Sequence, residues 1–103
     1  MTAGRERLPN RRGSMTFDVE SCGLWFTVTA SRFSDQRLAE VFIRNHKADS
    51  TAGIMASDAA IAASLALQFG CPVEVLRRAL SRDAQGKASS PLGAALDLLT
   101  VQR

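Results

Sequence analysis

Apolar and polar positions alternate along the first half of the chain. From Met15 to Asn45 the period is close to two, which is typical of strands that bury one face. We therefore expect three strands, at residues 16–20, 24–31 and 37–44. Ser21, Cys22 and Gly23 form a tight connection between the first two, and residues 34–36 supply turn chemistry before the third. Short links between consecutive strands predict an antiparallel meander.

The alternation also assigns side chains to faces. In the second strand, one face carries Trp25, Thr27 and Thr29, and the other carries Leu24, Phe26 and Val28. In the third strand, the apolar face is formed by Ala39, Val41 and Ile43, with Leu38, Glu40 and Phe42 opposite. One face of the sheet is thus available for packing by the rest of the chain.

The period then changes from two to that of a helix. Residues 54–69 carry an apolar stripe formed by Ile54, Ile61, Leu65 and Phe69. Six alanines between residues 56 and 66 flank this stripe and would allow close approach of the sheet or of a partner helix. Gly70 is expected just after the helix end, and Pro72 at the start of the next helix.

Two further helices are expected, at residues 73–80 and 92–101. The first directs Val73, Leu76 and Leu80 inward and Arg77 and Arg78 outward, and the segment 81–90 between the helices is a polar loop. In the second, Leu92, Ala95, Leu96 and Leu99 lie on one stripe. Strands first and helices afterwards predict an α+β fold, a three-stranded antiparallel meander with two to three helices on one face.

Length and charge refine this picture. The 103 residues suffice for one domain, with 46% hydrophobic and 22% charged residues. The net charge of +3 comes from residues 1–13, where Arg5, Arg7, Arg11 and Arg12 face only Glu6. Residues 14–103 are neutral overall. We therefore expect a flexible or loosely docked basic arm at 1–13 and a single domain at 14–103, which disfavours a dedicated nucleic-acid-binding body.

The cysteines and hydropathy exclude other classes. Cys22 and Cys71 form no CxxC motif and, with the single histidine His46, give no metal-ligand spacing, so we expect free thiols and no metal or other cofactor. No signal peptide is visible, and the apolar run at 54–67 is too short and too polar to span a bilayer. The prediction is a cytoplasmic protein without membrane contact.

Candidate catalytic residues are few. His46, with Asp49 and Ser50, has the residue types of a Ser/His/Asp set, but neighbours in sequence rarely meet that geometry. We therefore predict no catalytic residue, and a histidine that caps or contacts backbone. Nothing here indicates an enzyme acting on its own.

Candidate anion-binding residues are more numerous. Arg77, Arg78 and Arg82 form a basic cluster that would grip phosphate or a partner's carboxylates, unless Glu74 and Asp83 neutralise it. The segment 83–90 has the composition of an anion-binding loop before a helix, although Ser90 before Pro91 is equally typical of a helix cap. The candidate ligand-binding residues are His46, Lys47, Arg77, Arg78, Arg82, Lys87, Ser89 and Ser90.

Three motifs in the middle of the chain resemble the TSCPD domain, which occurs near the C-terminus of vitamin B12-dependent ribonucleotide reductases and in small separate proteins. Residues 45–49 (NHKAD) stand for its "GKAG"-like loop, residues 64–67 (SLAL) for its helix signature, and residues 70–72 (GCP) for its Gly-x-Pro helix start. The resemblance spans roughly residues 17–80.

This resemblance also has clear limits. The Thr-Ser-Cys-Pro-Asp stretch that names the domain is absent, and so are the reductase's terminal cysteine pair and its catalytic barrel. The resemblance therefore implies an accessory module rather than a reductase.

Two functions remain open. The first is a non-catalytic protein-interaction or regulatory module in nucleotide metabolism. Its partner would be a protein or a second copy, with a dimer favoured, because an alanine-rich helix and an unpaired sheet edge suit self-association. The alternative is a nucleotide or nucleic-acid binder that uses the arginine-rich arm with Arg77, Arg78, Arg82 and Lys87.

Overall fold

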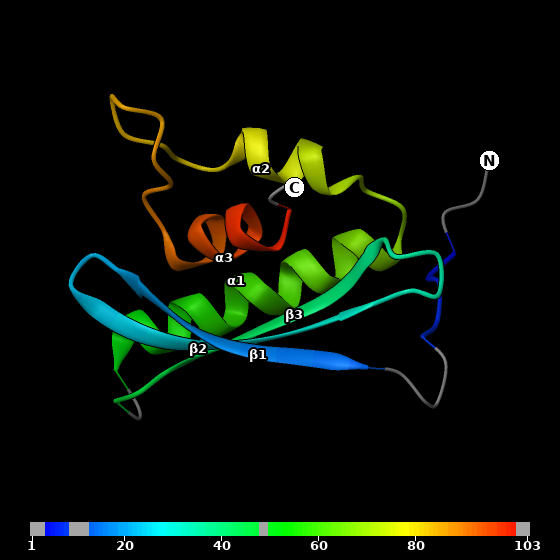
Figure 1. The fold of residues 1–103 in the computed structure, drawn as a ribbon, viewed down its shortest axis with the longest axis horizontal. Coiled ribbons are helices and arrows are strands. Elements are labelled where there is room, and N and C mark those ends of the chain that lie inside the picture. Colours follow the sequence, from blue (N-terminus) through cyan, green and yellow to red (C-terminus); the bar gives the residue numbers. More distant parts are fainter. Residues whose placement is uncertain (1–3, 9–12, 48–49, 101–103) are drawn as a thin grey trace.

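Three strands are followed by three helices, in the order that the sequence pattern predicts (Figure 1). The computed structural model describes residues 4–8, 13–47 and 50–100. The strands are β1 (Ser14–Ser21), β2 (Leu24–Arg32) and β3 (Leu38–Asn45). The helices are α1 (Thr51–Gln68), α2 (Val73–Ala79) and α3 (Pro91–Leu99). The sheet is antiparallel in the order β1-β2-β3, so the predicted α+β meander is confirmed.

The turn between β1 and β2 is as short as a hairpin allows. Ser21 pairs with Leu24, and both residues between them have positive φ, 56° for Cys22 and 78° for Gly23. Two consecutive positive φ values are typical of the type I′ turn, whose twist matches that of the strands. This turn fixes the register of the hairpin.

The helices cover one face of the sheet. α1 lies along β3, α3 lies near β1, and α2 lies farther from the sheet (Figure 1). Among the described residues, the largest side chains that are fully buried between these layers are Phe26, Val28, Val41 and Leu96. The predicted inward stripe of α3 is buried throughout, at Leu92, Ala95, Leu96 and Leu99.

Side chains of α1 hydrogen-bond to the outer edge of β3. The backbone N–H of Val41 donates to Ser64 Oγ at 2.8 Å, and the same hydroxyl donates to the Val41 carbonyl at 2.8 Å. One turn later, Gln68 Nε2 donates to the Ala39 carbonyl at 3.0 Å. Both polar side chains are buried. An edge strand exposes backbone groups that another strand can pair with, and here α1 occupies two positions of that edge.

This contact sets the rotation of α1 about its own axis, and that rotation differs from the one that the predicted apolar stripe implies. The residues packed against the sheet are small or polar at Ala56, Ala60, Ala63 and Ser64, together with Leu67 and Gln68. The large residues of the stripe are instead exposed, by 53% at Ile54, 46% at Ile61, 40% at Leu65 and 46% at Phe69. Close approach to a strand edge needs short side chains, so the alanine face is the packing face.

The junction between β3 and α1 is held by Asn45. Its Nδ2 donates to the Trp25 carbonyl, and its Oδ1 accepts hydrogen bonds from Lys47 N and Ser50 Oγ. Ser50 in turn caps α1 by accepting a hydrogen bond from Gly53 N. A Cβ at position 53 would lie 2.8 Å from Asn45 Cβ. Glycine at this position therefore allows the helix to start against the end of the strand.

The helix boundaries agree closely with the sequence. Ser90 caps α3 by accepting from Gly93 N at 3.1 Å, and Gly70 follows α1 with a φ of 103°. Pro72 precedes the first residue of α2 by one position. Cys22 and Cys71 are free, as predicted. No helix in the described part of the chain is long and apolar enough to cross a membrane.

One local prediction is wrong. Leu38 is buried rather than opposite the apolar face, because the pairing of β2 and β3 shifts between Ser31 and Arg32. The segment 81–90 connects α2 and α3 as the predicted loop, and within it Arg82 and Ala88 form an isolated antiparallel bridge.

Part of the predicted basic arm lies against the domain. Glu6 N donates to the Gln68 carbonyl at 2.7 Å, and Arg5 Nε donates to Gln68 Oε1 at 2.6 Å. The Glu6 carboxylate pairs with Arg37 at 3.0 Å. The remainder of the predicted arm, residues 1–3 and 9–12, lies outside the described residues.

Replacing Ser64 tests the edge contact. We expect Ser64→Ala to lower the free energy of unfolding by about 1–3 kcal/mol, because two backbone groups of Val41 lose their partner in a buried position. Urea denaturation followed by circular dichroism measures this. Ser57→Ala on the same helix is the control and should change stability by less than about 0.5 kcal/mol. Equal effects of the two substitutions would show that the hydroxyl bonds to β3 are dispensable.

Candidate functional site

The eight predicted ligand-binding residues do not converge on one site. Two of them, His46 and Lys47, follow β3. The other six lie on α2 or on the segment that leads to α3: Arg77, Arg78, Arg82, Lys87, Ser89 and Ser90. The two groups have different surroundings and are described in turn.

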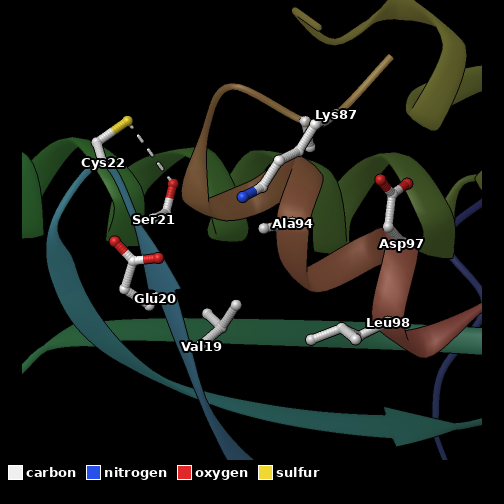
Figure 2. A pocket seen from close by; sticks show the side chains of 9 residues that line it. Val19, Glu20, Ser21, Cys22, Lys87, Ala94, Asp97 and Leu98 are labelled. Atoms are coloured by element: carbon white, nitrogen blue, oxygen red, sulfur yellow. Dashed lines mark hydrogen bonds between the residues drawn. The ribbon is translucent and has the colours of Figure 1, made fainter. Parts of the chain in front are cut away.

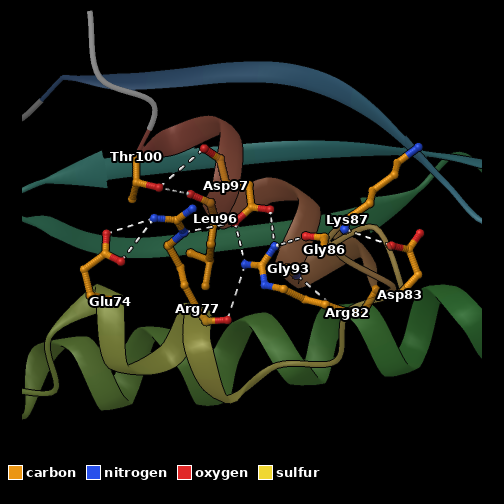
Figure 3. Close-up of polar contacts among 11 residues, drawn as sticks. Glu74, Arg77, Arg82, Asp83, Gly86, Lys87, Gly93, Leu96, Asp97 and Thr100 are labelled. Carbon is orange, nitrogen blue, oxygen red and sulfur yellow. Dashed lines mark hydrogen bonds and ion pairs between the residues drawn. The ribbon is translucent and has the colours of Figure 1, made fainter.

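Arg77 and Arg82 both bind the carboxylate of Asp97 (Figure 3). Arg77 Nε lies 2.9 Å from Asp97 Oδ1, and Arg82 donates to both carboxylate oxygens at 2.8 Å. Arg77 also pairs with Glu74 at 2.9 Å. The expected neutralisation by Glu74 is therefore confirmed, but the second acid is Asp97 of α3 rather than Asp83. Arg77 consequently points toward α3 and not outward.

The ion pairs change the pKa of the groups involved. The hydrogen bond from Arg82, and then that from Arg77, lower the pKa of Asp97 from 3.8 to about 2, against the opposing effect of burial. The same bonds raise the pKa of both arginines. This cluster joins α2 and the following segment to α3, and two of the predicted phosphate-binding guanidiniums already have acid partners.

The segment before α3 satisfies its own donors. Asp83 Oδ1 accepts hydrogen bonds from Gln85 N and Lys87 N, both at 2.9 Å. Gly86 N donates to the Asp83 carbonyl, and Ser89 N donates to the Ser81 carbonyl. The carboxylate of Asp83 thus occupies the place that an anion would take in a loop of this kind. Anion binding by this segment stays a prediction.

A cleft of about 300 Å³ lies between the end of β1 and α3 (Figure 2). Val19, Ala94 and Leu98 line it together with the charged side chains of Glu20, Lys87 and Asp97. Cys22 also lines it, with Sγ 3.5 Å from the Ser89 carbonyl. The lining is therefore partly apolar and partly charged, and its Asp97 carboxylate is already bound by Arg77 and Arg82.

His46 lies on the face of the sheet that the helices leave open. Its Nε2 is 3.0 Å from Thr27 Oγ1 and 3.4 Å from Asp18 Oδ1, and Thr27 donates to the same carboxylate oxygen at 3.0 Å. The backbone N–H of His46 donates to the Trp25 carbonyl, which agrees with the expectation that this residue contacts backbone. Asp18 and Thr27 were missed as its partners, although the hairpin register that places them opposite each other follows from a two-residue turn.

Of the other proposed neighbours, Asp49 lies outside the described residues and Ser50 caps α1. In the described ranges, no group of three or more His, Cys, Asp or Glu side chains has the arrangement of a metal site.

Comparison with known proteins gives a consistent result. The chain is 40% identical over 70 residues to a vitamin B12-dependent ribonucleotide reductase of Agrobacterium fabrum, which is 68% of this chain and 6% of that enzyme. The corresponding enzyme of Streptantibioticus cattleyicolor is 37% identical over 70 residues, 12% of its length. That of Rhodopirellula baltica is 36% identical over 72 residues, or 70% of this chain and 7% of the enzyme.

About seventy residues of this chain are homologous to a short segment of vitamin B12-dependent ribonucleotide reductases. No family model matches the chain, and no solved structure does. The chain spans only 6–12% of the length of these reductases. The relation to the reductases that the motifs imply is therefore confirmed over this segment.

The Asp97 cluster of this reductase-related chain predicts a definite pH dependence. Since the folded state lowers the pKa of Asp97 from 3.8 to about 2, its contribution is complete above pH 3.8 and is lost as the pH falls toward 2. We expect Asp97→Asn to lower the free energy of unfolding at neutral pH by on the order of 1–2 kcal/mol, allowing for screening at a partly exposed site. The difference from the wild type should shrink on acidification.

Denaturant unfolding at neutral pH and at several values between pH 2 and 4 measures this. Asp83→Asn in the segment before α3 is the matched control, because the Asp83 side chain accepts backbone hydrogen bonds that an amide oxygen can also accept. If Asp97→Asn and the wild type lost stability in parallel on acidification, the ion pairs would not be the cause.

Proposed function

We propose that this chain is a TSCPD-like module that acts in nucleotide metabolism by binding protein, and that its partner is a second copy of itself. Two observations support this. The homologous segment belongs to ribonucleotide reductases but makes up a small share of them, which fits a module rather than the catalytic unit. The second observation is the apolar outward surface of α1, and it is the reason for proposing a second copy as the partner.

The outward face of α1 has the composition of an interior helix. Five large apolar side chains lie on or just beyond it with exposures of 40–66%: Ile54, Met55, Ile61, Leu65 and Phe69. Asp58 is the single charged residue among the eighteen of this helix. A helix on a protein surface normally carries charged residues on its outer face, and one that is apolar all round is normally buried. This face therefore has the character of an interface.

The area of this face fits a pair of identical helices. Five large side chains that are about half exposed offer on the order of 500 Å² per copy, so that a symmetric pair would bury roughly 1,000 Å², near the lower limit for a specific interface. A twofold axis brings the same patch of each copy together, which suits a surface that is apolar and nearly uncharged along its length. The proposed dimer is thus moderate in strength and should depend on concentration.

A charge placed on this face tests the proposal. We expect the wild type to sediment as a dimer in equilibrium with monomer at micromolar concentrations, and Ile61→Lys to shift it to monomer by raising the dissociation constant at least about tenfold. Sedimentation equilibrium measures both. The matched control is Val75→Lys, since Val75 is an apolar residue on α2 that is 54% exposed and lies outside this face.

Circular dichroism establishes that both variants are folded. A wild type that remains monomeric at about 100 µM, far above the dissociation constants of stable dimers, would rule out the second copy as the partner. A dimer that Ile61→Lys and Val75→Lys affect equally would place the contact elsewhere.

A further inference from the structure

Two clefts lie next to each other where the C-terminal end of β3 meets the first turns of α1. The first, of about 370 Å³, includes Phe42, Thr27 and Thr29. The second, of about 270 Å³, includes Lys47 and lies at the start of α1. Arg44 and Ser57 line both clefts, so the two clefts are adjacent, and together they are called the depression below. Each cleft is near the lower end of the usual size range for small-molecule sites.

The cations in this depression differ from the three arginines that form ion pairs in the described part of the chain. The guanidiniums of Arg37, Arg77 and Arg82 are each engaged by carboxylates of the chain. Arg44 and Lys47, in contrast, have no acid partner among the described residues. Both belong to the short stretch that Asn45 fixes by its hydrogen bonds. Two unpaired positive charges on a well-anchored segment favour an anionic ligand.

The first cleft adds features that a simple anion would not use. The Phe42 ring is 46% exposed on the open face of the sheet, where an aromatic face can stack on a flat ring. Thr29 lies directly opposite Phe42, and Thr27 opposite Arg44. The Thr27 hydroxyl donates to Asp18, and the Thr29 hydroxyl is hydrogen-bonded to that of Thr16. Each threonine oxygen keeps acceptor capacity for a donor on the edge of such a ring or on its sugar.

Two acids have to be taken into account. Asp18 accepts a hydrogen bond from Thr27 beside the first cleft and lies 3.4 Å from His46. Asp58 lines the second cleft with Lys47 and Arg44. At the second cleft these three side chains leave a net positive charge, so an anion is still favoured there. A carboxylate is also a good acceptor for sugar hydroxyls, as in the ribose contacts of dinucleotide sites.

We propose that this depression binds a mononucleotide, with the base on Phe42 and the phosphate between Arg44 and Lys47. A mononucleotide joins a flat ring, hydroxyls and an anion in one molecule, and the depression presents a partner for each. This site shares Ile54 with the proposed dimer face and differs from the predicted anion-binding cluster around Arg77 and Arg82.

Calorimetric titration with adenosine monophosphate, adenosine and inorganic phosphate tests this proposal. We expect adenosine monophosphate to bind more tightly than either of its two parts, since each part engages only one end of the depression. Its affinity should fall with increasing salt because charged contacts are screened.

Substitutions identify the site. Arg44→Gln should weaken binding of adenosine monophosphate at least about tenfold, as expected for loss of a charged hydrogen bond to phosphate. Phe42→Leu should weaken it several-fold while leaving the weak binding of inorganic phosphate unchanged. Arg78→Gln is the matched control, because Arg78 is an exposed cation on α2 away from both clefts, and it should have no effect.

Several results would overturn the proposal. The first is the absence of any heat of binding with adenosine monophosphate at about 10 mM, a concentration at which even weak specific ligands saturate their sites. The second is an equal loss of affinity for adenosine monophosphate in Arg44→Gln and Arg78→Gln. Binding of a thymidine oligonucleotide that depends on Arg44, without binding of the mononucleotide, would assign the surface to nucleic acid instead. Sedimentation of the same variants keeps this result separate from that on the dimer.

Discussion

The outer edge of β3 sets the arrangement of the rest of the molecule. A strand edge next to a packed helix carries backbone groups that need partners. Here Ser64 and Gln68 of α1 bond to the backbone of Val41 and Ala39. These bonds are directional, so they fix how α1 is rotated about its own axis. Once the rotation is fixed, the alanines face the strand and the large apolar residues face outward. The surface proposed for self-association is thus a consequence of how the sheet edge is satisfied.

Local patterns predicted most of the fold. Period-two alternation located the strands, and Ser90 and Gly70 marked helix ends because a cap and a positive φ are properties of single residues. The rotation of α1 was not predictable in this way. A rule that buries the largest apolar residues selects Ile61 and Leu65, whereas the structure buries the residues that can approach and bond to the strand. Burial of apolar area and hydrogen bonding to the strand thus favour different faces of α1. The outcome depends on β3, whose bonded residues lie more than twenty positions away in the sequence.

The site residues show the same division. That Arg77 would pair with Glu74 follows from helical spacing. That Arg77 and Arg82 would share Asp97 does not, because it depends on how α2 packs on α3. The sequence shows a basic cluster at this position, but in the folded chain two of its arginines, Arg77 and Arg82, form ion pairs with Asp97. Arg44 and Lys47, at the end of β3, have no acid partner among the described residues. Nothing in the sequence pattern distinguished Arg44 from other surface arginines. Net charge along the chain therefore says less about ligands than the pairing of each charge does.

Ile54 links the two proposed surfaces. It belongs to the outward apolar face of α1 and also lines the cleft that contains Lys47. A second copy packed on α1 would cover part of that cleft wall, whereas a ligand in the cleft would order the same side chain. Binding at two sites that share a group is coupled, and the coupling is reciprocal: whatever factor dimerisation applies to ligand affinity, the ligand applies to dimerisation. In a small module with these two surfaces, ligand binding and assembly state would therefore affect each other. The sign of the coupling depends on whether Ile54 keeps the same conformation in both complexes.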